Sequence, residues 1–580
     1  MRVIVTAGHV DHGKSTLVRR LTGMEPDRWA EERRRGLTID LGFAWTRIGG
    51  EDVAFVDVPG HERFVPNMLA GAGPAPAVLF VVAADEGWMP QSAEHLAALD
   101  AFGADRGLLV VTKADRAGPA AATAVALREI AATSLGTVPS VAVSGTTGAG
   151  LDELRAAIGE LTARLPPPDT TADVRLWIDR AFTVSGAGTV VTGTLAAGTI
   201  AVGDELRLGD ARGRVRGLQA LGEPRDRVEA VARVAVNLRG TARADVRRGD
   251  VLLTPGRWRT TTEFDVRLRC AAGAAGAAAA DLHRYLVVHL GTAAVPVRVR
   301  PLGTDTARLT TTTALPLRAG DRGLLRDPGE HRIAAGFDVL DVDPPPLARR
   351  GAARARGREL AGPDLARTYL HRNGFVPAGD FAVLGLPETG ERVGDWFADP
   401  ERFAALRAEA TAIVGAWDST AAGVPVEALR QRLGLPAAEL VVPILAGTGF
   451  EVTGGLVRRP GAGLAPAVEK ALEKVAKQLA EHPFRAPEAD ELRALGLGRR
   501  ELAAAVRRGR LTAVAEGVVL GPDADERAVA ELRLLPQPFT VSAARKALDS
   551  TRRVMIPLLE RLDAAGWTEP LGDGTRRTTG

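Results

Sequence analysis

In residues 7–16, AGHVDHGKST, four residues separate Gly8 from the run Gly13, Lys14 and Ser15, a spacing typical of phosphate-binding loops. Glycines allow the backbone to turn its N–H groups toward a phosphate, and a helix that follows adds the positive end of its dipole. Lys14 is predicted to bridge the β- and γ-phosphates of a nucleotide, and Ser15 to bind Mg²⁺. The loop residues expected to contact the nucleotide are Asp11, His12, Gly13, Lys14, Ser15 and Thr16.

Lysine is rare in this chain. Six of the 74 basic residues are lysine, and among the first 450 residues only Lys14 and Lys113 are lysine. A sequence that uses arginine nearly everywhere else indicates that these two positions need a compact ammonium and not a planar guanidinium.

The stretch VAFVDVPGHE, residues 53–62, ends an apolar run with a carboxylate. Asp57 is predicted to end a strand, where it can hold Mg²⁺ through water. Gly60 can present its backbone N–H to a γ-phosphate and move when that phosphate is lost. Asp-x-x-Gly strings are common by chance, so the position of this one after the phosphate-binding loop is what supports the interpretation.

The stretch LLVVTKAD, residues 108–115, carries a candidate base-binding group. Asp115 can accept hydrogen bonds from N1–H and the 2-amino group of guanine, while the stem of Lys113 lies over the base. Adenine lacks this pair of donors, so the motif predicts GTP as the nucleotide. Thr112, in the same motif, is also predicted to bind it. A later stretch, VAVSGTTGAG, ends another predicted strand, and two of its residues are placed to bracket the base: Ser144 and Gly145.

Residues 31–43, EERRRGLTIDLGF, are strongly charged and then interrupted by glycine, which is typical of a mobile loop leading into a strand. Thr38 is positioned to give its hydroxyl to Mg²⁺ in the triphosphate state. For the arginine run alone, a solvated charged loop is the simpler interpretation.

Short apolar strands must position these motifs. Residues 2–7 (RVIVTA) are predicted to form a buried strand, and residues 15–21 to open a helix. This strand–loop–helix setting is the context that a phosphate-binding loop requires.

GHVDHGKST, RGLTIDLGF, DVPGHE and TKAD, in this order and spacing, resemble the motifs of the translational GTPases, the group that contains elongation factor Tu. The resemblance implies a doubly wound α/β GTPase domain that binds GTP or GDP with Mg²⁺. It also implies that His61 orients the water that attacks the γ-phosphate, with ribosome contact moving it into place. Thr112 departs from the pattern, since many relatives carry Asn there; a hydroxyl can make a similar local bond, so we expect guanine preference to survive with altered affinity.

After the proline-rich break at residues 165–171, short β-branched runs alternate with glycine, and turn signals about every ten residues predict β-barrels. Within the elongation factor group, residues 177–194 (WIDRAFTVSGAGTVVTGT) are similar to the selenocysteine-specific elongation factors. That resemblance implies that Asp179, Arg180 and Arg233 enclose the aminoacyl group. A structural Asp–Arg bridge is the alternative that the residues alone leave open.

The chemistry of selenium agrees with such a pocket. A selenol is a stronger acid than a thiol and is expected to be a selenolate at neutral pH, whereas a seryl hydroxyl stays neutral. Two desolvated guanidiniums would favour the anion, and a seryl group would leave them buried without a counter-charge.

The C-terminal third repeats one pattern, in residues 426–460, 489–522 and 541–578. Each copy has a short amphipathic helix, a turn, a second helix and a small β-hairpin, which predicts a winged helix. Residues 361–415 are a partial match, so the number of copies, three or four, stays open.

Winged helices bind DNA, RNA or protein, so their fold leaves the function open. In the last copy, basic residues gather at the start of the second helix and in the hairpin, where phosphates would be met; a solvated arginine-rich surface is the alternative. Pro557 implies that the second helix begins near Ile556 or is kinked. The family resemblance implies that this copy grips an mRNA hairpin beside a UGA codon. The residues predicted to contact RNA are Arg545, Lys546, Arg552, Arg553, Arg576 and Arg577.

We therefore expect a multidomain protein. Its predicted parts are an α/β P-loop GTPase domain at 1–167, β-barrels at 172–258 and 259–343, a linker at 344–360, and tandem winged-helix domains at 361–580, the last at about 530–580.

Composition sets limits on class and compartment. The net charge of +3 is too small to prove a nucleic-acid partner, and the single cysteine, Cys270, excludes an intrachain disulfide and fits a reducing compartment. No signal peptide and no apolar run of about 20 residues is found, so we expect a cytoplasmic protein without a membrane partner, and a monomer.

These expectations combine in a GTP-dependent elongation factor whose partners are selenocysteyl-tRNA, an mRNA hairpin and the ribosome. Three alternatives stay open. The first is an elongation factor Tu-like GTPase that carries a different aminoacyl-tRNA. The second is a GTPase subunit of a sulfate-activating enzyme, which would not explain repeated winged helices. The third is a GTP-gated winged-helix regulator that binds nucleic acid, which would leave the barrels without a role.

Overall fold

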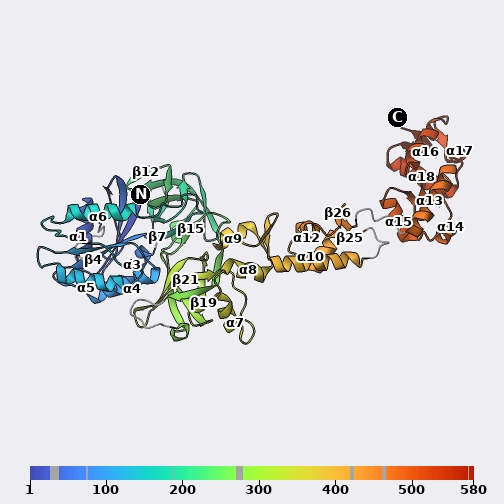
Figure 1. Cartoon of the computed structure of the whole chain (residues 1–580). Helices are drawn as coiled ribbons and strands as arrows, with labels where there is room; N and C mark the ends of the chain where they lie inside the picture. Colours follow the sequence, from blue (N-terminus) through green and yellow to red (C-terminus); the bar gives the residue numbers. More distant parts are fainter. Residues whose placement is uncertain are drawn as a thin grey trace. The chain divides into compact units, whose positions relative to one another are not determined.

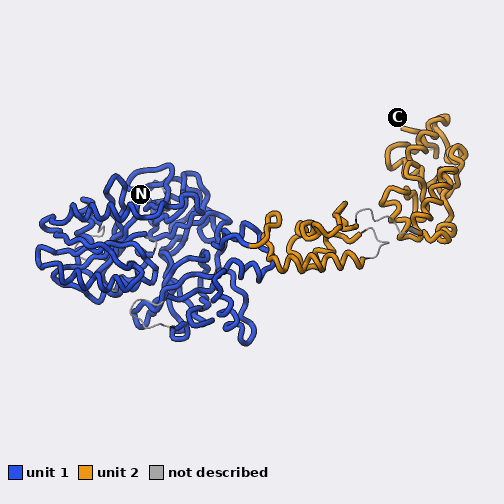
Figure 2. Tube along the Cα trace, viewed as in Figure 1, with its two compact units in different colours: residues 1–389 blue, residues 390–580 orange. Residues whose placement is uncertain are grey.

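The computed structural model of the chain describes residues 1–26, 38–73, 76–186, 188–269, 278–417, 423–459, 466–571 and 574–579. Residues 31–37 of the predicted charged loop lie outside the described residues, as does Cys270. The chain forms two compact units, residues 1–389 and 390–580, which are blue and orange in Figure 2. The first unit contains an α/β domain and two barrels, and the second contains small helical domains with β-hairpins (Figure 1).

The first domain is built on a six-stranded sheet with the order β2-β3-β1-β4-β5-β6. All neighbouring strands are parallel except β2 and β3. The strands are β1 (Arg2–Ala7), β2 (Gly42–Ile48), β3 (Glu51–Asp57), β4 (Ala77–Ala83), β5 (Gly107–Thr112) and β6 (Ser140–Ala142). Every residue of β4 and β5 is buried, which explains their unbroken apolar sequences in a sheet that helices cover on both faces.

Helices form a layer on each face of this sheet (Figure 1). Leu17 and Ile158 place α1 and α6 in one core with the sheet, while Leu69, Leu99 and Ile130 place α3, α4 and α5 in the other. The helices are α1 (Lys14–Thr22), α3 (Val65–Ala72), α4 (Pro90–Phe102), α5 (Ala120–Ala131) and α6 (Leu151–Ala163), with a 3₁₀ turn η1 (Glu62–Phe64).

The predicted motifs follow parallel strands, so they meet at one edge of the sheet. The phosphate-binding loop follows β1, Asp57 is the last residue of β3, and Thr112 is the last residue of β5. This edge is where open α/β sheets bind their ligands.

The next six strands close into a barrel in the order β10-β15-β7-β8-β14-β11, with β11 pairing back to β10. Along β14, buried and less buried residues alternate, as expected for a strand with one face toward a core. The strands are β7 (Arg175–Val184), β8 (Gly188–Leu195), β10 (Glu205–Leu208), β11 (Ala211–Ala220), β14 (Ala232–Arg239) and β15 (Val251–Leu253), with short side strands β9 (Thr199–Ala201), β12 (Glu223–Arg225) and β13 (Arg227–Glu229).

A second closed barrel has the order β16-β19-β18-β17-β20-β21. Phe264 and Phe337 fill its centre, with ring centroids 6.3 Å apart. The two predicted barrels are thus confirmed. The strands are β16 (Thr260–Arg269), β17 (Tyr285–Leu290), β18 (Ala293–Pro301), β19 (Thr306–Pro316), β20 (Arg322–Asp327) and β21 (Arg332–Asp341).

The segment 344–360, predicted to be a linker, differs from that prediction because it contains a helix, α7 (Ala352–Leu360). Arg356 on this helix is 3% exposed, and its guanidinium binds the buried carboxylates of Asp265, at 2.8 Å, and Asp341 in the second barrel. Arginine-rich composition suggested a solvated segment, but this arginine completes a buried ion cluster that fixes the helix to the barrel.

Two successive copies of the predicted winged helix follow in the second unit, each a bundle of three helices with a β-hairpin. The first contains α10 (Pro400–Gly415), α11 (Val426–Leu433), α12 (Val441–Leu445), β26 (Glu451–Thr453) and β27 (Leu456–Arg458), and the second contains α13 (Pro466–Glu481), α14 (Ala489–Ala494), α15 (Arg499–Arg507), β28 (Thr512–Ala515) and β29 (Val518–Leu520). The longest described helices, α10 and α13, have 16 residues each, and no described helix is long and apolar enough to cross a bilayer.

The last copy has the same plan. It contains α16 (Ala524–Arg533), α17 (Val541–Ala547), α18 (Arg552–Ala564), β31 (Thr568–Pro570) and β32 (Thr575–Thr578). Pro557 lies inside α18, so this helix begins four residues before Ile556 and not at it. A fourth copy at 361–415 stays a prediction, because these residues extend across the boundary between the two units.

Replacing Arg356 with alanine should destabilise the second barrel by about 3 kcal/mol, because buried carboxylates lose a counter-charge. Arg308, whose Nε is 2.6 Å from the carboxylate of Asp265, remains in the variant and balances part of the negative charge. Hydrogen exchange of the β16 and β21 amides measures this local stability and should become faster. Arg358→Ala, at an exposed position of α7, is the control, and equal exchange in the two variants would contradict the role of the ion cluster.

Candidate functional site

The phosphate-binding loop connects β1 to α1. Gly8 has a φ of 134°, and a Cβ there would lie 2.1 Å from the carbonyl oxygen of Val81, so only glycine fits. Gly13, with a φ of 80°, turns the chain directly into the helix. Lys14 is 5% exposed, and its Nζ donates to the carbonyl oxygens of Gly8 (3.0 Å) and His9 (2.7 Å). These bonds hold the ammonium inside the loop.

Two buried histidines support this loop as neutral imidazoles. His12 donates from Nδ1 to the carbonyl oxygen of Val81 (3.2 Å), and burial lowers the pKa of His12 to about 4. His95 on α4 accepts a hydrogen bond at Nδ1 from the N–H of Gly8 (3.0 Å). Burial, together with the charge of Lys14, lowers the pKa of His95 to about 3. Sequence reasoning missed His95, because a single histidine on an apolar helix gives no signal of its contact.

The three predicted metal ligands lie together. Ser15 Oγ donates to Asp57 Oδ2 (2.6 Å) and lies 2.9 Å from Thr38 Oγ1. Asp57 is fully buried at the end of β3, and Thr6 Oγ1 donates to its Oδ1 (2.7 Å). Two hydroxyls and a carboxylate form the all-oxygen donor set that Mg²⁺ prefers, so these residues fit the predicted ion.

Gly60 approaches the phosphate-binding loop closely. A Cβ at this position would lie 2.4 Å from Lys14 Nζ and 2.5 Å from the backbone nitrogen of Val10, so a side chain would collide. His61 follows directly, is half-buried, and accepts a hydrogen bond at Nδ1 from the N–H of Arg63 (3.2 Å). The predicted catalytic histidine is therefore next to the segment that contacts the loop.

A cavity of about 400 Å³ opens beside the start of α1. Seven of the residues predicted to bind nucleotide line it: Asp11, Gly13, Thr16, Thr112, Lys113, Asp115 and Gly145. The lining residues that sequence reasoning missed are Leu17, Arg19, Arg20, Arg116, Val143 and Thr146. The cavity thus extends from the phosphate-binding loop to the TKAD motif, as one nucleotide site requires.

Thr112 and Lys113 are held in place around this cavity. Thr112 Oγ1 donates to the carbonyl oxygen of His12 (2.7 Å), which joins the base-binding strand to the phosphate-binding loop. Lys113 Nζ lies 2.5 Å from Glu86 and 3.3 Å from Asp85. Burial lowers the pKa of Lys113, but these carboxylates raise it more, so its pKa is above its usual value. Ser144 is buried, and its Oγ accepts a hydrogen bond from the backbone of the following loop, outside the cavity lining.

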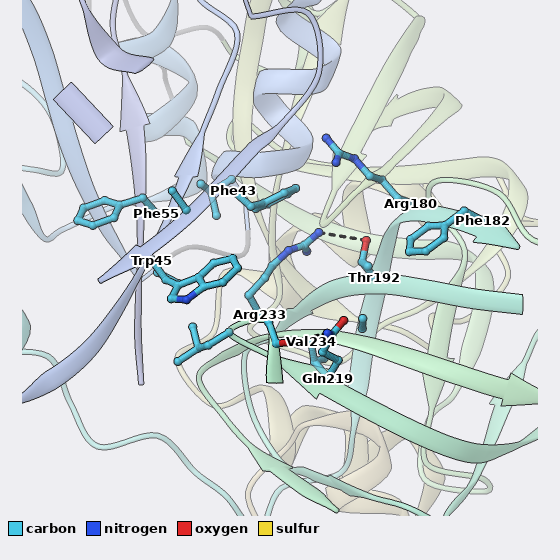
Figure 3. Close-up of a pocket in the computed structure, with 15 residues that line it drawn as sticks. Phe43, Trp45, Phe55, Arg180, Phe182, Thr192, Gln219, Arg233 and Val234 are labelled. Atoms are coloured by element: carbon cyan, nitrogen blue, oxygen red, sulfur yellow. Dashed lines mark hydrogen bonds between the residues drawn. The ribbon is translucent and has the colours of Figure 1, made fainter. Parts of the chain in front are cut away.

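A second cavity, of about 200 Å³, lies where the α/β domain meets the first barrel (Figure 3). Strand β2 contributes its aromatic wall, Phe43 and Trp45, and β7 and β14 contribute Arg180 and Arg233. The other lining residues are Ala44, Ala54, Phe55, Val56, Phe182, Thr192, Gln219, Leu221, Gly222, Val234 and Ala235. Two of the three residues predicted to enclose an aminoacyl group therefore line one pocket.

Arg233 is fixed by the barrel itself. Its guanidinium makes a two-pronged pair with the carboxylate of Asp179, and Nη2 also donates to Thr192 Oγ1 (3.1 Å). The guanidinium lies 3.8 Å from the centre of the Phe43 ring, a cation–π contact visible in Figure 3. Asp179, which is 4% exposed, thus acts behind the pocket by orienting an arginine.

Arg180 is held by the segment that leads into β2. Its Nε donates to Asp40 Oδ2 (3.1 Å), and its Nη2 donates to the carbonyl oxygen of Leu41. Burial raises the pKa of Asp40, but the charges of Arg180 and Arg248 lower it more, so this carboxyl group stays ionised. Sequence reasoning named neither Asp40 nor Arg248, because their partners are far away along the chain.

The six predicted RNA contacts fall into two groups. Arg553 Nη2 donates to the carbonyl oxygens of Ala486 and Pro487, and Arg576 Nε donates to Asp563 Oδ2 (2.9 Å), so these two arginines make contacts within the chain. The others are more accessible: Lys546, Arg552 and Arg577 are exposed and Arg545 is half-buried.

Family comparisons match three parts of the chain. Residues 1–164 match the elongation factor Tu GTP binding domain, and residues 188–253 match elongation factor Tu domain 2. Residues 531–577 match the winged helix of elongation factor SelB.

Curated relatives extend these matches. The selenocysteine-specific elongation factor of Desulfomicrobium baculatum is 43% identical over 274 residues, which are 46% of this chain and 43% of that protein. Elongation factor Tu 2 of Streptomyces avermitilis is 34% identical over 292 residues, 46% of this chain and 75% of that protein. The chain spans between 43% and 62% of the length of the selenocysteine-specific relatives that it matches.

A solved structure agrees with these relatives. The crystal structure of a bacterial selenocysteine-specific elongation factor, EF-Sec, superposes with a TM-score of 0.74 and 26% identity, covering 100% of both chains. The chain has a GTP-binding domain of the elongation factor Tu type, followed by barrels and winged helices. It belongs to the elongation factor Tu family of translational GTPases.

Proposed function

We propose that this protein is a GTP-dependent elongation factor that delivers selenocysteyl-tRNA to ribosomes at UGA codons marked by an mRNA hairpin. It works in the cytoplasm as a monomer. The observation that carries the proposal is the pocket of two arginines and an aromatic wall between the GTP-binding domain and the first barrel. The cargo is supported by two of the similar proteins, the factor of Desulfomicrobium baculatum and EF-Sec, which are selenocysteine-specific elongation factors.

The GTPase cycle follows from the loop residues. Lys14 binds the β- and γ-phosphates, and Gly60 presents its N–H to the γ-phosphate. Ser15, Thr38 and Asp57 would hold Mg²⁺, which when bound neutralises charge on these phosphates. His61 orients the attacking water once the ribosome has moved it, and loss of the γ-phosphate then frees Gly60 to move.

The cargo pocket favours an anion. Three guanidiniums, of Arg180, Arg233 and Arg248, face two carboxylates, of Asp40 and Asp179. These five groups carry a net charge of +1, which one selenolate would neutralise. A seryl hydroxyl would leave the excess charge without a partner in a confined site, and this cost supports discrimination against serine.

Guanine recognition can be tested at Asp115. Asp115→Asn should weaken GTP binding about 100-fold, because the carboxylate that accepts two hydrogen bonds from guanine is lost. The amide offers a donor to the 2-oxo group of xanthine, so affinity for xanthosine triphosphate should rise. Equilibrium binding of fluorescent nucleotides measures both, with exposed Asp152→Asn as the control. Unchanged GTP affinity would remove Asp115 from the site.

The cargo proposal is tested by the retention of one tRNA body charged with selenocysteine or with serine. With a non-hydrolysable GTP analogue, the protein should retain the selenocysteyl form preferentially, and Arg233→Ala should reduce that preference about 100-fold, because it removes one charge and leaves Asp179 unpaired. Arg227→Ala, an exposed arginine of the same barrel, should have no effect. Equal retention of both tRNAs by the unmodified protein would overturn the cargo assignment.

The last winged helix is proposed to bind the mRNA hairpin through the residues that remain accessible. Hairpin loops are read through unstacked bases and backbone shape, which suits a basic helix start and hairpin. Arg553 and Arg576, which already have partners within the chain, contribute by holding that surface in shape.

Replacing Arg545 and Lys546 together with alanine should weaken binding of a short RNA hairpin and lower the slope of log affinity against log salt by about 1 to 2. Fluorescence anisotropy of the full chain at several salt concentrations measures this. Arg493→Ala, which removes an arginine 72% exposed on the preceding copy, is the control. Stronger binding to duplex DNA than to the RNA hairpin would favour a regulator of transcription instead.

A further inference from the structure

The two arginines of the cargo pocket have partners of different kinds. Arg233 is paired with Asp179 and Thr192, which belong to the same barrel. Arg180, in contrast, is bound by Asp40 and by the carbonyl oxygen of Leu41, which precede β2 in the GTP-binding domain. One cation of the pocket is therefore fixed by the barrel, and the other depends on where residues 38–41, here termed the Thr38 segment, lie.

Arg248 connects three parts of the molecule with one guanidinium. Its Nη2 donates to Asp40 in the Thr38 segment, and its Nη1 donates to Asn67 Oδ1 on α3 (2.5 Å). Its Nε donates to the backbone oxygen of Asp179 (2.9 Å), the residue that orients Arg233. Arg248 thus contacts the Thr38 segment, α3 and the strand behind the pocket.

The same segment is tied to the nucleotide site. Thr38 Oγ1 lies 2.9 Å from Ser15 Oγ, and Asn67 Nδ2 donates to the carbonyl oxygen of Ile39 (2.8 Å). Asp40 follows Thr38 by two residues, a span of about 7 Å at most, so a larger movement of the segment away from Ser15 draws its carboxylate from between Arg180 and Arg248.

The ion pairs of Asp40 with Arg180 and Arg248 are partly buried, which strengthens the attraction between their charges. The side chains of Asp40 and Arg180 are 20% and 18% exposed, and that of Arg248 is 30% exposed. Loss of Asp40 would leave two guanidiniums without their shared carboxylate and weaken the hold on Arg180, which would keep its bond to the carbonyl oxygen of Leu41.

We propose that Asp40 and Arg248 are positioning residues that couple the state of the nucleotide to the cargo pocket. While Thr38 lies at Ser15, Asp40 holds Arg180 beside Phe43 (Figure 3), and Arg248 ties this arrangement to α3. When the Thr38 segment leaves, Arg180 loses Asp40 and the carbonyl oxygen of Leu41, so the pocket weakens and releases its cargo. This inference rests on the proposed function for the identity of the cargo.

The coupling is measured as the ratio of two affinities for selenocysteyl-tRNA, one with a GTP analogue bound and one with GDP bound. The affinity of selenocysteyl-tRNA is determined with a non-hydrolysable GTP analogue and with GDP, for the unmodified protein, Asp40→Asn, Arg248→Ala and the double variant. Each single variant should lower the ratio of the two affinities by about tenfold or more. The double variant should lower it little further, because both substitutions break the same contact. Arg247→Ala, which removes the same charge at an exposed neighbouring position, should leave the ratio unchanged.

A second measurement needs no cargo. Because the Asp40 contact exists in the arrangement with Thr38 at Ser15, the same variants should bind the GTP analogue less well relative to GDP, by a similar factor. If both ratios stay at the value of the unmodified protein, or the two substitutions act additively, the inference is overturned.

A failure of the proposed function would give a different experimental result from a failure of the coupling. If the unmodified protein retains selenocysteyl-tRNA and seryl-tRNA equally, the cargo assignment falls. The nucleotide ratios without cargo then still decide whether Asp40 and Arg248 couple the two domains.

Discussion

The short span between Thr38 and Asp40 is the constraint on which the working arrangement depends. Two residues cover at most about 7 Å of chain, so a hydroxyl beside Ser15 and a carboxylate beside Arg180 move together. One connection therefore joins a site for phosphates and a metal ion to a pocket in a different domain. Rearrangement at the γ-phosphate needs no long path to reach the barrel, because the same segment belongs to both sites.

Charge is placed in this molecule in buried, mutually neutralising groups. Asp179 with Arg233 behind the pocket and Asp265 with Arg308 and Arg356 in the second barrel are pairs that burial would make costly if either partner were absent. Guanidinium suits these places because its planar fork binds a carboxylate at two points. Lys14 is different: its ammonium is surrounded by backbone carbonyl oxygens within a tight loop, where a fork would not fit. The scarcity of lysine in the sequence is thus consistent with the geometry.

The features that the sequence predicted correctly are those formed by residues close together in the chain. Apolar strands followed by Ser15, Asp57 and Asp115 indicated the nucleotide site, because a motif and its strand are adjacent in the chain. Hairpin and helix periodicities predicted the barrels and the winged helices for the same reason. Contacts over long sequence separations left no such pattern. Arg248 and Asp40 are 208 residues apart, and composition could not separate Arg356, which is buried, from the exposed arginines around it. The same limit applies to Arg553 and Arg576, which were predicted as RNA contacts from their charge and their place in a winged helix and have partners within the chain.

Under the proposed function, the unequal anchoring of Arg180 and Arg233 separates two tasks that a delivery factor must perform. Selectivity for an anionic side chain needs a cation whose position does not vary, and Arg233 has that property because Asp179 and Thr192 hold it within one barrel. Timed release needs a wall that can be withdrawn, and in the proposed coupling Arg180 provides it, because Asp40 and Leu41, which bind it, follow Thr38. If both arginines were anchored in the barrel, the pocket would select its cargo equally well in either nucleotide state. A ligand that binds two states with equal affinity does not change the equilibrium between them. Such a pocket could therefore not respond to GTP hydrolysis.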